Sequence, residues 1–399
     1  MNNLIKSIRE ELPFFKDGYI YLDSASTSLT PKPVIEAMIE YYEQYRANIG
    51  RGIYCAAKLA TSAYENARES IAKFINAKPE EIIFVKNTTE AINIVAKGLS
   101  FNKEDNIITT ILEHHSNYIP WINISKIKGC SIKIVKTDKE GNIDLMNFSS
   151  YINKKTKIIA ITQTSNVLGV RPPLKEIIKI AHENNSLVLV DGAQSVPHMK
   201  VNVKELDCDF LAFSGHKMCG PTGIGVLYIK EELQDMIEPL CIGGGSVEDV
   251  DLYNYILKKS PEKYEGGTPP IAEVIGLGVA VSFLNSIGMD KIEVHERIIT
   301  EKLIKELSEI NGIKLYGPKD AYKRAGIVAF NINGKHPNDV AKELDKFKIM
   351  VRSGHHCALP LHKFILKAPN GTVRVSIYFY NTLDDIIRLI EVLKNFNLY

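Results

Sequence analysis

The sequence is short of cysteine and carries little excess charge. Its 399 residues include six cysteines, and no two of them form a C-x-x-C pair. A disulfide scaffold is therefore not expected in a chain of this size. The formal net charge at pH 7 is only +2, so the protein has no general attraction to nucleic acid or to an anionic membrane. We expect neither of these as a partner.

Long hydrophobic runs are absent as well. Residues 1–19 contain no apolar run ahead of their charges, so they predict neither a secretory signal nor a membrane span. No other stretch is apolar for the length that a bilayer requires. Together with the scarce cysteines, this pattern indicates a reduced, cytoplasmic protein. The chain is long enough for two or three domains with full hydrophobic cores.

Short apolar runs alternate with amphipathic stretches through the middle of the chain. The runs are rich in Ile and Val and apolar on both faces, as a buried parallel sheet requires. The amphipathic stretches between them, for example 88–98 and 173–184, predict helices that cover the sheet. The expected strands are residues 81–86, 106–111, 132–136, 157–162, 187–191, 210–214 and 225–229.

The pattern changes at the Gly/Pro break EGGTPP, residues 265–270. Beyond it we expect helices at 271–286, 290–310 and 337–347, strands at 326–332, 349–353 and 372–380, and a final helix from Leu383. The fold class predicted is therefore α/β. Residues 1–20 form a segment that packs on the domains, and residues 21–265 form a large domain with a mostly parallel central sheet. Residues 266–399 supply linking helices and a smaller C-terminal α+β domain.

Polar residues follow five of the expected strands. In an open α/β sheet, ligands bind at the carboxyl ends of the strands, so these side chains are expected on one rim. They are Asn87, Thr88, Thr89 and Glu90; Glu113, His114 and His115; Gln163, Thr164, Ser165 and Asn166; Asp191 and Gln194; and Ser214, His216 and Lys217.

Three of these positions match three parts of one ligand. Lys217 can bond covalently to a carbonyl cofactor, and Asp191 can keep a pyridine nitrogen protonated. Thr88 and Thr89 open a helix whose free N–H groups favour a phosphate. Taken singly, each has a plain structural reading: a surface lysine, a turn aspartate and an N-cap. Taken together, they indicate pyridoxal 5′-phosphate (PLP), which carries an aldehyde, a pyridine nitrogen and a phosphate.

Several motifs resemble those of one enzyme family. They are DGAQS, SGHKMCGPTGIG, EHHSNYIPW, TSNVLG, NTTEAIN, EGGTP and RSGHHCALP. The resemblance is to class V aminotransferase-like PLP enzymes, and within them to the cysteine desulfurase/selenocysteine lyase branch of the SufS type. It runs from residue 21 to residue 382 and implies PLP-dependent fold type I and a homodimer.

The resemblance also implies an activity. The protein would remove sulfur from L-cysteine, or selenium from L-selenocysteine, and release L-alanine. The sulfur would remain as a persulfide on Cys357 for an acceptor protein of the SufE/SufU type, as in iron–sulfur cluster assembly. A thiolate nucleophile is required, and nearby positive groups such as Arg352 favour one.

Roles in the site follow from the same resemblance. Lys217 would bind the cofactor's aldehyde and move the substrate's Cα proton, and His114 would stack on its ring. Asp191 would pair with the pyridine nitrogen. Gln194 would bond the ring hydroxyl, with Asn166 nearby. The phosphate would be held by Thr88, Thr89, Ser214 and His216, and by Thr268 of the other subunit. The substrate carboxylate would pair bidentately with Arg374, oriented by Arg352 and Asn166.

Cys357, in RSGHHCALP, can be a metal ligand, a nucleophile or a buried filler. A metal needs several ligands at fixed geometry, whereas adjacent side chains of an extended segment point to opposite faces. No second Cys/His cluster is present in the sequence, so we predict no metal site. Gly354 and the two histidines before Cys357 indicate a loop rather than a core strand. The buried-filler interpretation suits Cys130, Cys208 and Cys241 better.

The sequence departs from the family pattern in two places. Gly50 stands where relatives often have His, and Cys219 stands where they often have a bulky residue; Cys219 is a second oxidisable thiol or a buried filler. After Cys357 the chain lacks the long insertion of the IscS-like branch, so we expect an enzyme that is weak alone and a partner that comes to the site. Two alternatives stay open: another class V enzyme, such as an aminotransferase or epimerase, and a non-catalytic sulfur-carrier scaffold.

Overall fold

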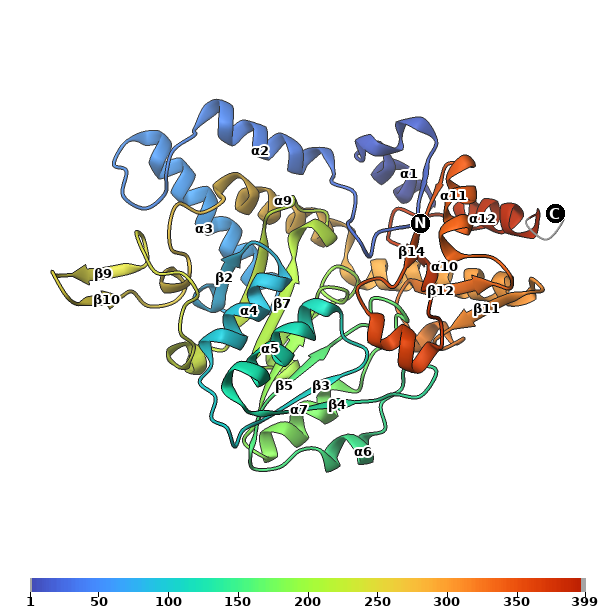
Figure 1. Ribbon diagram of the computed structural model, residues 1–399. Helices are drawn as coiled ribbons and strands as arrows, with labels where there is room; N and C mark the ends of the chain where they lie inside the picture. Colours follow the sequence, from blue (N-terminus) through green and yellow to red (C-terminus); the bar gives the residue numbers. More distant parts are fainter. Residues whose placement is uncertain (1, 396–399) are drawn as a thin grey trace.

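The computed structural model describes residues 2–395, and a seven-stranded sheet forms its largest layer (Figure 1). The strand order is β2-β8-β7-β6-β5-β3-β4. From β7 to β4 all neighbours are parallel, whereas β8 runs antiparallel to both β7 and β2. The predicted mostly parallel α/β sheet is confirmed. The strands are β2 Ile82–Val85, β3 Asn106–Thr110, β4 Ser131–Val135, β5 Thr156–Thr162, β6 Leu187–Asp191, β7 Phe210–Ser214 and β8 Gly225–Ile229.

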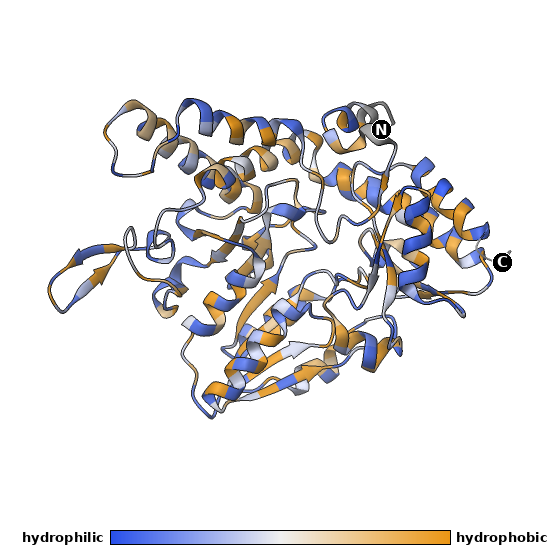
Figure 2. Cartoon of the chain, turned by 45° about the horizontal axis from the view of Figure 1, so that its top comes forward, coloured by the Kyte–Doolittle hydropathy of each residue, from blue (hydrophilic) through white to orange (hydrophobic). Residues whose placement is uncertain are grey.

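Burial of the strands explains their composition. The inner strands are buried on both faces, and their apolar residues form the orange centre of Figure 2. The expectation of two apolar faces is wrong for β4, because its residues alternate between exposed and partly buried. β4 is an edge strand, and charged, solvated side chains there discourage pairing with other chains.

Helices pack closely over the sheet. α2 (Lys32–Gln44) and α3 (Cys55–Ile75) lie against α9 (Ile271–Ile287). α9 approaches α3 so closely that a Cβ on Gly278 would lie 2.7 Å from the Cβ of Ala67. The remaining helices of this part are α4 Thr88–Gly98, α5 Ile119–Lys128, α6 Leu145–Ser150, α7 Leu174–Glu183 and α8 Val203–Leu206.

A second, antiparallel sheet follows α10 (Met289–Glu309) and has the order β11-β12-β15-β14. The register of β14 and β15 places Arg352 directly opposite Arg374. The expected single strand at 349–353 is wrong, because the chain breaks between β13 and β14 and β13 instead pairs with β1. The elements are β1 Ile20–Tyr21, β11 Ile313–Tyr316, β12 Ile327–Ile332, α11 Pro337–Lys346, β13 Ile349–Met350, β14 Arg352–Gly354, β15 Thr372–Ser376 and α12 Leu383–Asn395.

The strand expected at 372–380 is also shorter, since β15 ends at Ser376. The N-terminal helix α1 (Asn2–Glu10) reaches the turn beyond it. Arg9 donates through Nε to the carbonyl of Tyr380 (2.7 Å) and pairs with Asp385 of α12. The division into units 1–20, 21–265 and 266–399 stays a prediction.

A hairpin of β9 (Val247–Val250) and β10 (Tyr255–Leu257) projects from the body of the protein (Figure 1). Among residues 2–395, no single helix has the length and apolar character to cross a bilayer. α9 and α10, bent by 71° to each other, satisfy that criterion only as a pair and by length and composition alone.

Candidate active site

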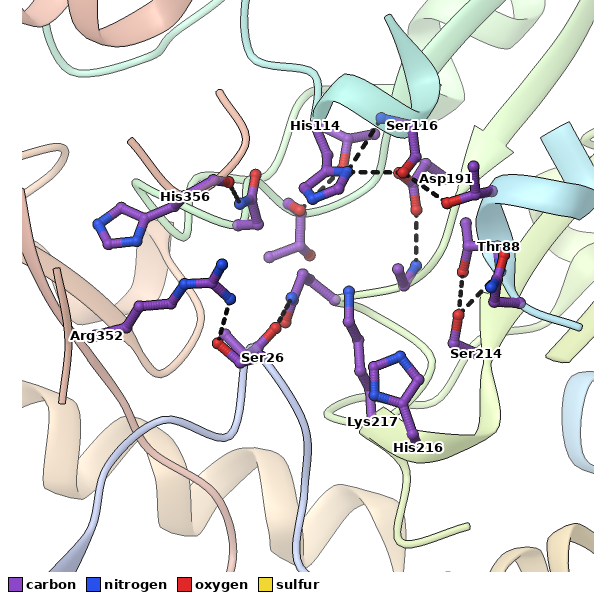
Figure 3. A pocket seen from close by; sticks show the side chains of 18 of the residues that line it. Ser26, Thr88, His114, Ser116, Asp191, Ser214, His216, Lys217, Arg352 and His356 are labelled. Carbon is purple, nitrogen blue, oxygen red and sulfur yellow. Dashed lines mark hydrogen bonds between the residues drawn. The ribbon is translucent and has the colours of Figure 1, made fainter. Parts of the chain in front are cut away.

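One cavity of about 210 Å³ gathers most of the side chains that the sequence analysis singled out (Figure 3). They come from the carboxyl ends of β5, β6 and β7, from the start of α4, and from β14 and β15 of the second sheet. The predicted residues that line the cavity are Thr88, Thr89, His114, Asn166, Asp191, Gln194, Ser214, His216, Lys217, Arg352 and Arg374.

Lys217 ends the 3-10 turn that follows β7. Its side chain keeps some surface toward the cavity, while protein surrounds its amine. Burial lowers the pKa of Lys217, and the nearby Asp191 carboxylate opposes that effect only in part. Asp191 ends β6, accepts a 3.0 Å bond from the Ala193 amide, and has its own pKa raised by burial. A buried, more readily neutral amine is suited to attack a carbonyl carbon.

His114 faces the cavity from the loop between β3 and α5 (Figure 3). Its Nδ1 accepts from the Ser116 amide (3.1 Å) and lies 3.0 Å from the Ser116 hydroxyl. Burial, aided by the positive charge of Lys217, lowers the pKa of His114 to about 3. The imidazole is therefore neutral near pH 7. Beneath it, the buried Glu113 accepts from Thr110 and Asn117 (2.6 and 2.7 Å) and anchors the loop.

The start of α4 brings backbone N–H groups and hydroxyls to one end of the cavity. The Thr88 amide donates to Ser214 Oγ (2.9 Å), and the hydroxyls of Thr88 and Ser214 lie 2.7 Å apart. Thr89 Oγ1 contacts the hydroxyl of Ser116 at 2.7 Å. Burial lowers the pKa of His216 to about 4. Helix N–H groups and hydroxyls together suit a phosphate.

Buried polar atoms at the cavity wall test whether PLP fits. Within residues 2–395, Gln194 Oε1, Asn166 Oδ1 and Thr164 Oγ1 are buried without a hydrogen-bond partner, and all three residues line the cavity. Buried polar atoms without partners are costly in a protein that offers them no ligand. Lys217, Asp191 and the start of α4 are placed for an aldehyde, a pyridine nitrogen and a phosphate. The residues fit PLP.

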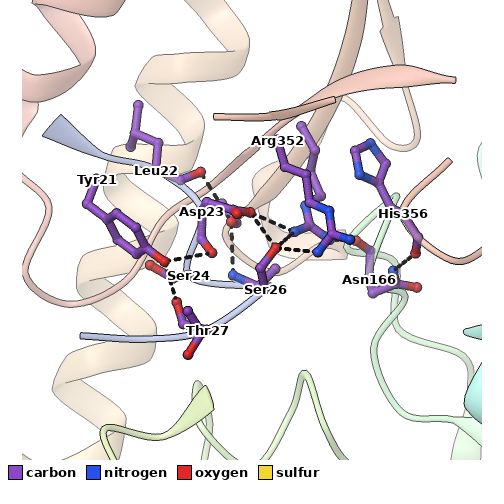
Figure 4. Close-up of polar contacts among 12 residues, drawn as sticks. Tyr21, Leu22, Asp23, Ser24, Ser26, Thr27, Asn166, Arg352 and His356 are labelled. Carbon is purple, nitrogen blue, oxygen red and sulfur yellow. Dashed lines mark hydrogen bonds and ion pairs between the residues drawn. The ribbon is translucent and has the colours of Figure 1, made fainter. Parts of the chain in front are cut away.

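Arg352 and Arg374 also line the cavity, and Figure 4 shows Arg352 beside Ser26. Arg374 is almost wholly buried, and it donates through Nη1 to the Asn166 carbonyl (3.0 Å) and through Nη2 to Asp23 Oδ1 (2.8 Å). Arg352 donates to Ser26 Oγ at 2.7 Å. The sequence analysis missed Asp23 and Ser26, although both lie in the YLDSAS segment that begins the family resemblance.

The Cys357 loop is held in an uncommon backbone conformation. His356 and Cys357 have φ of +50° and +54°, a left-handed region that costs non-glycine residues of the order of 1–3 kcal/mol each. Asn166 Nδ2 donates to the His356 carbonyl (2.7 Å), which holds the loop to the cavity wall. Cys357 itself does not line the cavity, but it is half-buried and directly follows His356, which does.

Thr268 is not brought to this cavity. It lies with Asn48, whose Nδ2 is 3.5 Å from its hydroxyl, and lines a separate cavity with Gly50 and Arg51. The interpretation of Cys241 as a buried filler is wrong, because Cys241 is exposed.

Cys219, Cys130 and Cys208 are buried. Burial raises the pKa of Cys219 to about 12. That shift makes Cys219 a poor thiolate.

A family profile for class-V aminotransferases matches residues 20–389. The chain belongs to the aminotransferase class-V family. The predicted family resemblance and fold class are therefore confirmed, and membership of this family agrees with the fit of the site to PLP.

Relatives within the class-V family are close in sequence and structure. The chain is 48% identical to a probable cysteine desulfurase of Pyrococcus abyssi, over 98% of this chain and 96% of that protein. It is 49% identical to one of Halalkalibacterium halodurans, over 94% and 92% of the two chains. The apo structure of a cysteine desulfurase from Thermococcus onnurineus NA1 superposes with a TM-score of 0.95 at 46% identity, covering 98% and 97% of the two chains.

Proposed function

We propose that this class-V protein is a PLP-dependent cysteine desulfurase that converts L-cysteine to L-alanine and keeps the sulfur as a persulfide on Cys357. One observation carries the proposal: a half-buried cysteine, on a loop pinned in a left-handed conformation, lies beside a cavity that holds Lys217, Asp191 and two arginines. Its relatives that are named cysteine desulfurases give further support.

The chain's own residues have distinct tasks in this reaction. When bound, PLP supplies an electron sink that makes the substrate's Cα proton acidic and its Cβ–Sγ bond labile. Arg374 and Arg352 hold the substrate carboxylate, which fixes the orientation of Cα and Cβ. Lys217 Nζ, whose pKa burial lowers, accepts the Cα proton. Neutral His114 covers one side of the cofactor position.

Cys357 then takes the sulfur. Its Sγ attacks the substrate Sγ as a thiolate, so an S–S bond forms while the Cβ–Sγ bond breaks. The electron pair of the broken bond stays on the three-carbon fragment, which takes up a proton at Cβ, regains its Cα proton from Lys217 Nζ and leaves as alanine. The persulfide sulfur is next passed to an acceptor thiol. The loop after Cys357 enters a π-helix at Leu361–Leu366 and is short, so we assign this step to a visiting acceptor of the SufE/SufU type.

We also assign a homodimer, because Thr268 is remote from its own chain's cavity yet is proposed to bind cofactor phosphate. The β9–β10 hairpin supports this, since a second copy would cover its exposed apolar side chains. Leu252 and Tyr253 at its tip are 90% and 91% exposed. All six cysteines are unpaired, which agrees with a reducing, cytoplasmic location.

Alanine release tests the activity. Purified protein loaded with PLP is mixed with excess L-cysteine, without acceptor, and alanine is counted per active site. Wild type is expected to give about one alanine per site and then slow, because the persulfide blocks the nucleophile. Cys357→Ala is expected to give none, whereas Cys241→Ala, which removes an exposed thiol elsewhere, behaves as wild type.

Two outcomes would count against the proposal. If PLP-loaded wild type makes no alanine from cysteine, or if Cys357→Ala matches it, the desulfurase assignment fails. The protein would then be assayed with L-selenocysteine, whose selenium leaves more readily and depends less on Cys357, and for the transamination or epimerisation of other class-V enzymes.

A further inference from the structure

Ser26 lies between the two arginines of the cavity (Figure 4). Its Oγ accepts a 2.7 Å hydrogen bond from Arg352 Nη1 and a 2.8 Å bond from Arg374 Nη2. The same hydroxyl donates to Asp23 Oδ1 at 2.7 Å. The Ser26 oxygen is neutral, although it accepts from two guanidinium groups. A carboxylate oxygen in the same place would form stronger hydrogen bonds with them.

Both hydrogens of Arg374 Nη2 are engaged, because they meet Asp23 Oδ1 and Ser26 Oγ at 2.8 Å each. Nη1 donates one of its two hydrogens to the Asn166 carbonyl, and Nε is buried without a partner among the described residues. A carboxylate can pair bidentately with either of two edges of a guanidinium, Nη1 with Nη2 or Nε with Nη2. Both edges include Nη2. As placed, Arg374 can form the expected bidentate pair only if one Nη2 bond gives way.

Ser26 is the partner that gives way at lower cost. Asp23 neutralises a nearly buried arginine, and breaking such an ion pair leaves an uncompensated charge. Ser26 is neutral, and its hydroxyl leaves the arginines by rotation about a single χ1 bond. Asp23 pairs with Arg374, whereas Arg352 forms no ion pair within residues 2–395. One positive charge is left to be balanced, which matches a single carboxylate.

We propose that the Ser26 hydroxyl occupies the place of one carboxylate oxygen of the amino-acid substrate and is displaced when that carboxylate binds, so that Ser26 sets the affinity of the site for carboxylates. The proposal deepens the desulfurase assignment and rests on it for the identity of the substrate. The carboxylate-binding step itself needs no sulfur chemistry. Ser26 therefore acts through the two arginines and not on the reacting atoms.

Removing the hydroxyl is expected to tighten carboxylate binding. In Ser26→Ala the two arginines lose a competing acceptor that is fixed in place. The Kd for a simple carboxylate then falls by about tenfold or more, as expected when competing hydrogen bonds to charged groups are lost. For L-cysteine the KM falls by a similar factor while kcat stays the same, because the gain is equal in ground state and transition state.

The test measures binding of propionate to the PLP-loaded protein by calorimetry or NMR titration up to about 100 mM, a range suited to ligands this weak. Propionamide, with the same shape and no charge, is the neutral probe. The variants are Ser26→Ala, Ser26→Thr, which keeps a hydroxyl, and Thr27→Ala, which removes a neighbouring hydroxyl that bonds the His216 carbonyl instead. We expect tighter propionate binding only in Ser26→Ala, and no effect with propionamide.

Equal or weaker propionate binding in Ser26→Ala overturns the proposal, as does the absence of propionate binding in every variant. A tightening also seen in Ser26→Thr overturns it, because the hydroxyl would then not be responsible. The desulfurase assignment is judged separately from alanine release by wild type. If propionate binding tightens as expected but no alanine forms from cysteine, the carboxylate subsite stands and the proposed function fails.

Discussion

The backbone amide of His115 donates a 2.7 Å hydrogen bond to the carbonyl oxygen of Cys357. The His115 ring adds a second contact, because its Nε2 accepts from the Leu359 amide at 3.2 Å. Together these two bonds flank the cysteine proposed as nucleophile. They offset the cost of two successive left-handed residues, His356 and Cys357, and so keep the loop in one conformation.

Loss of the His115 ring is expected to loosen this loop. His115→Ala removes the acceptor for the Leu359 amide, so alkylation of Cys357 by iodoacetamide should speed up about two- to fivefold, the effect of one neutral hydrogen bond. Peptide mass mapping measures the rate, with the exposed Cys55 and Cys241 as internal references. His115→Gln, which keeps an acceptor at similar reach, should restore the slow rate. An unchanged rate in His115→Ala would contradict this account of the loop.

Lys217 is expected to be the lysine that binds PLP covalently. Borohydride reduction of the PLP-loaded protein should leave a pyridoxyl group on one lysine, and peptide mass spectrometry should find it at Lys217. Lys217→Arg should carry no label, because a guanidinium is a poor nucleophile. The matched control is Lys263→Arg, since burial also lowers the pKa of Lys263 but that lysine bonds the Gln234 carbonyl. If Lys217→Arg still carries the pyridoxyl label, Lys217 is not the lysine that binds PLP.

Thr268 should act in the partner's site rather than in its own. Thr268→Ala is expected to weaken PLP binding about tenfold through loss of a charge-assisted bond to phosphate. Lys217→Ala should be inactive. When the two variants are unfolded and refolded together, mixed dimers contain one site with both Lys217 and Thr268. At a PLP concentration near the wild-type Kd, where Thr268→Ala holds little PLP, random pairing in a two-fold dimer should return activity to about a quarter of the wild-type level.

The mixing experiment has a clear contrary outcome. If Thr268 served its own chain, every site with Lys217 would lack it, and mixing would restore nothing. A monomer by sedimentation at assay concentration would refute the dimer directly.

His356 should make the protein less stable in mild acid. Burial lowers its pKa to about 2, whereas in the unfolded chain it titrates near 6.5. Between about pH 2 and pH 6.5 the unfolded chain binds a proton at His356 that the folded protein does not bind. The contribution of neutral His356 to the free energy of unfolding is therefore full above about pH 6.5 and is lost as the pH falls below it. From pH 7.5 to 5.5 the loss is about 1.4 kcal/mol.

Urea unfolding of wild type and His356→Gln at the two pH values isolates this effect. Gln can still donate to the Thr372 carbonyl, which His356 Nε2 meets at 3.1 Å, but it does not titrate. The destabilisation caused by His356→Gln should therefore be smaller at pH 5.5 by about 1.4 kcal/mol. An equal difference at both values would show that His356 does not stay neutral.

The sequence by itself determined the fold class and most of the site. Apolar runs with polar residues at their ends predicted the inner strands, and the rule that ligands bind at the carboxyl ends of parallel strands predicted one rim. Lys217, Asp191 and Thr88 do line one cavity. These features could be predicted because each depends on a local pattern and on a general property of α/β sheets.

Tertiary structure alone decided the rest. The register of β14 and β15 sets Arg352 opposite Arg374, and the segment after β1 then places Ser26 between them. No local pattern reports such a meeting, because it depends on the pairing of segments from opposite ends of the chain. For the same reason the sequence did not distinguish the edge strand β4 from the inner strands, and did not show that Cys241 is exposed.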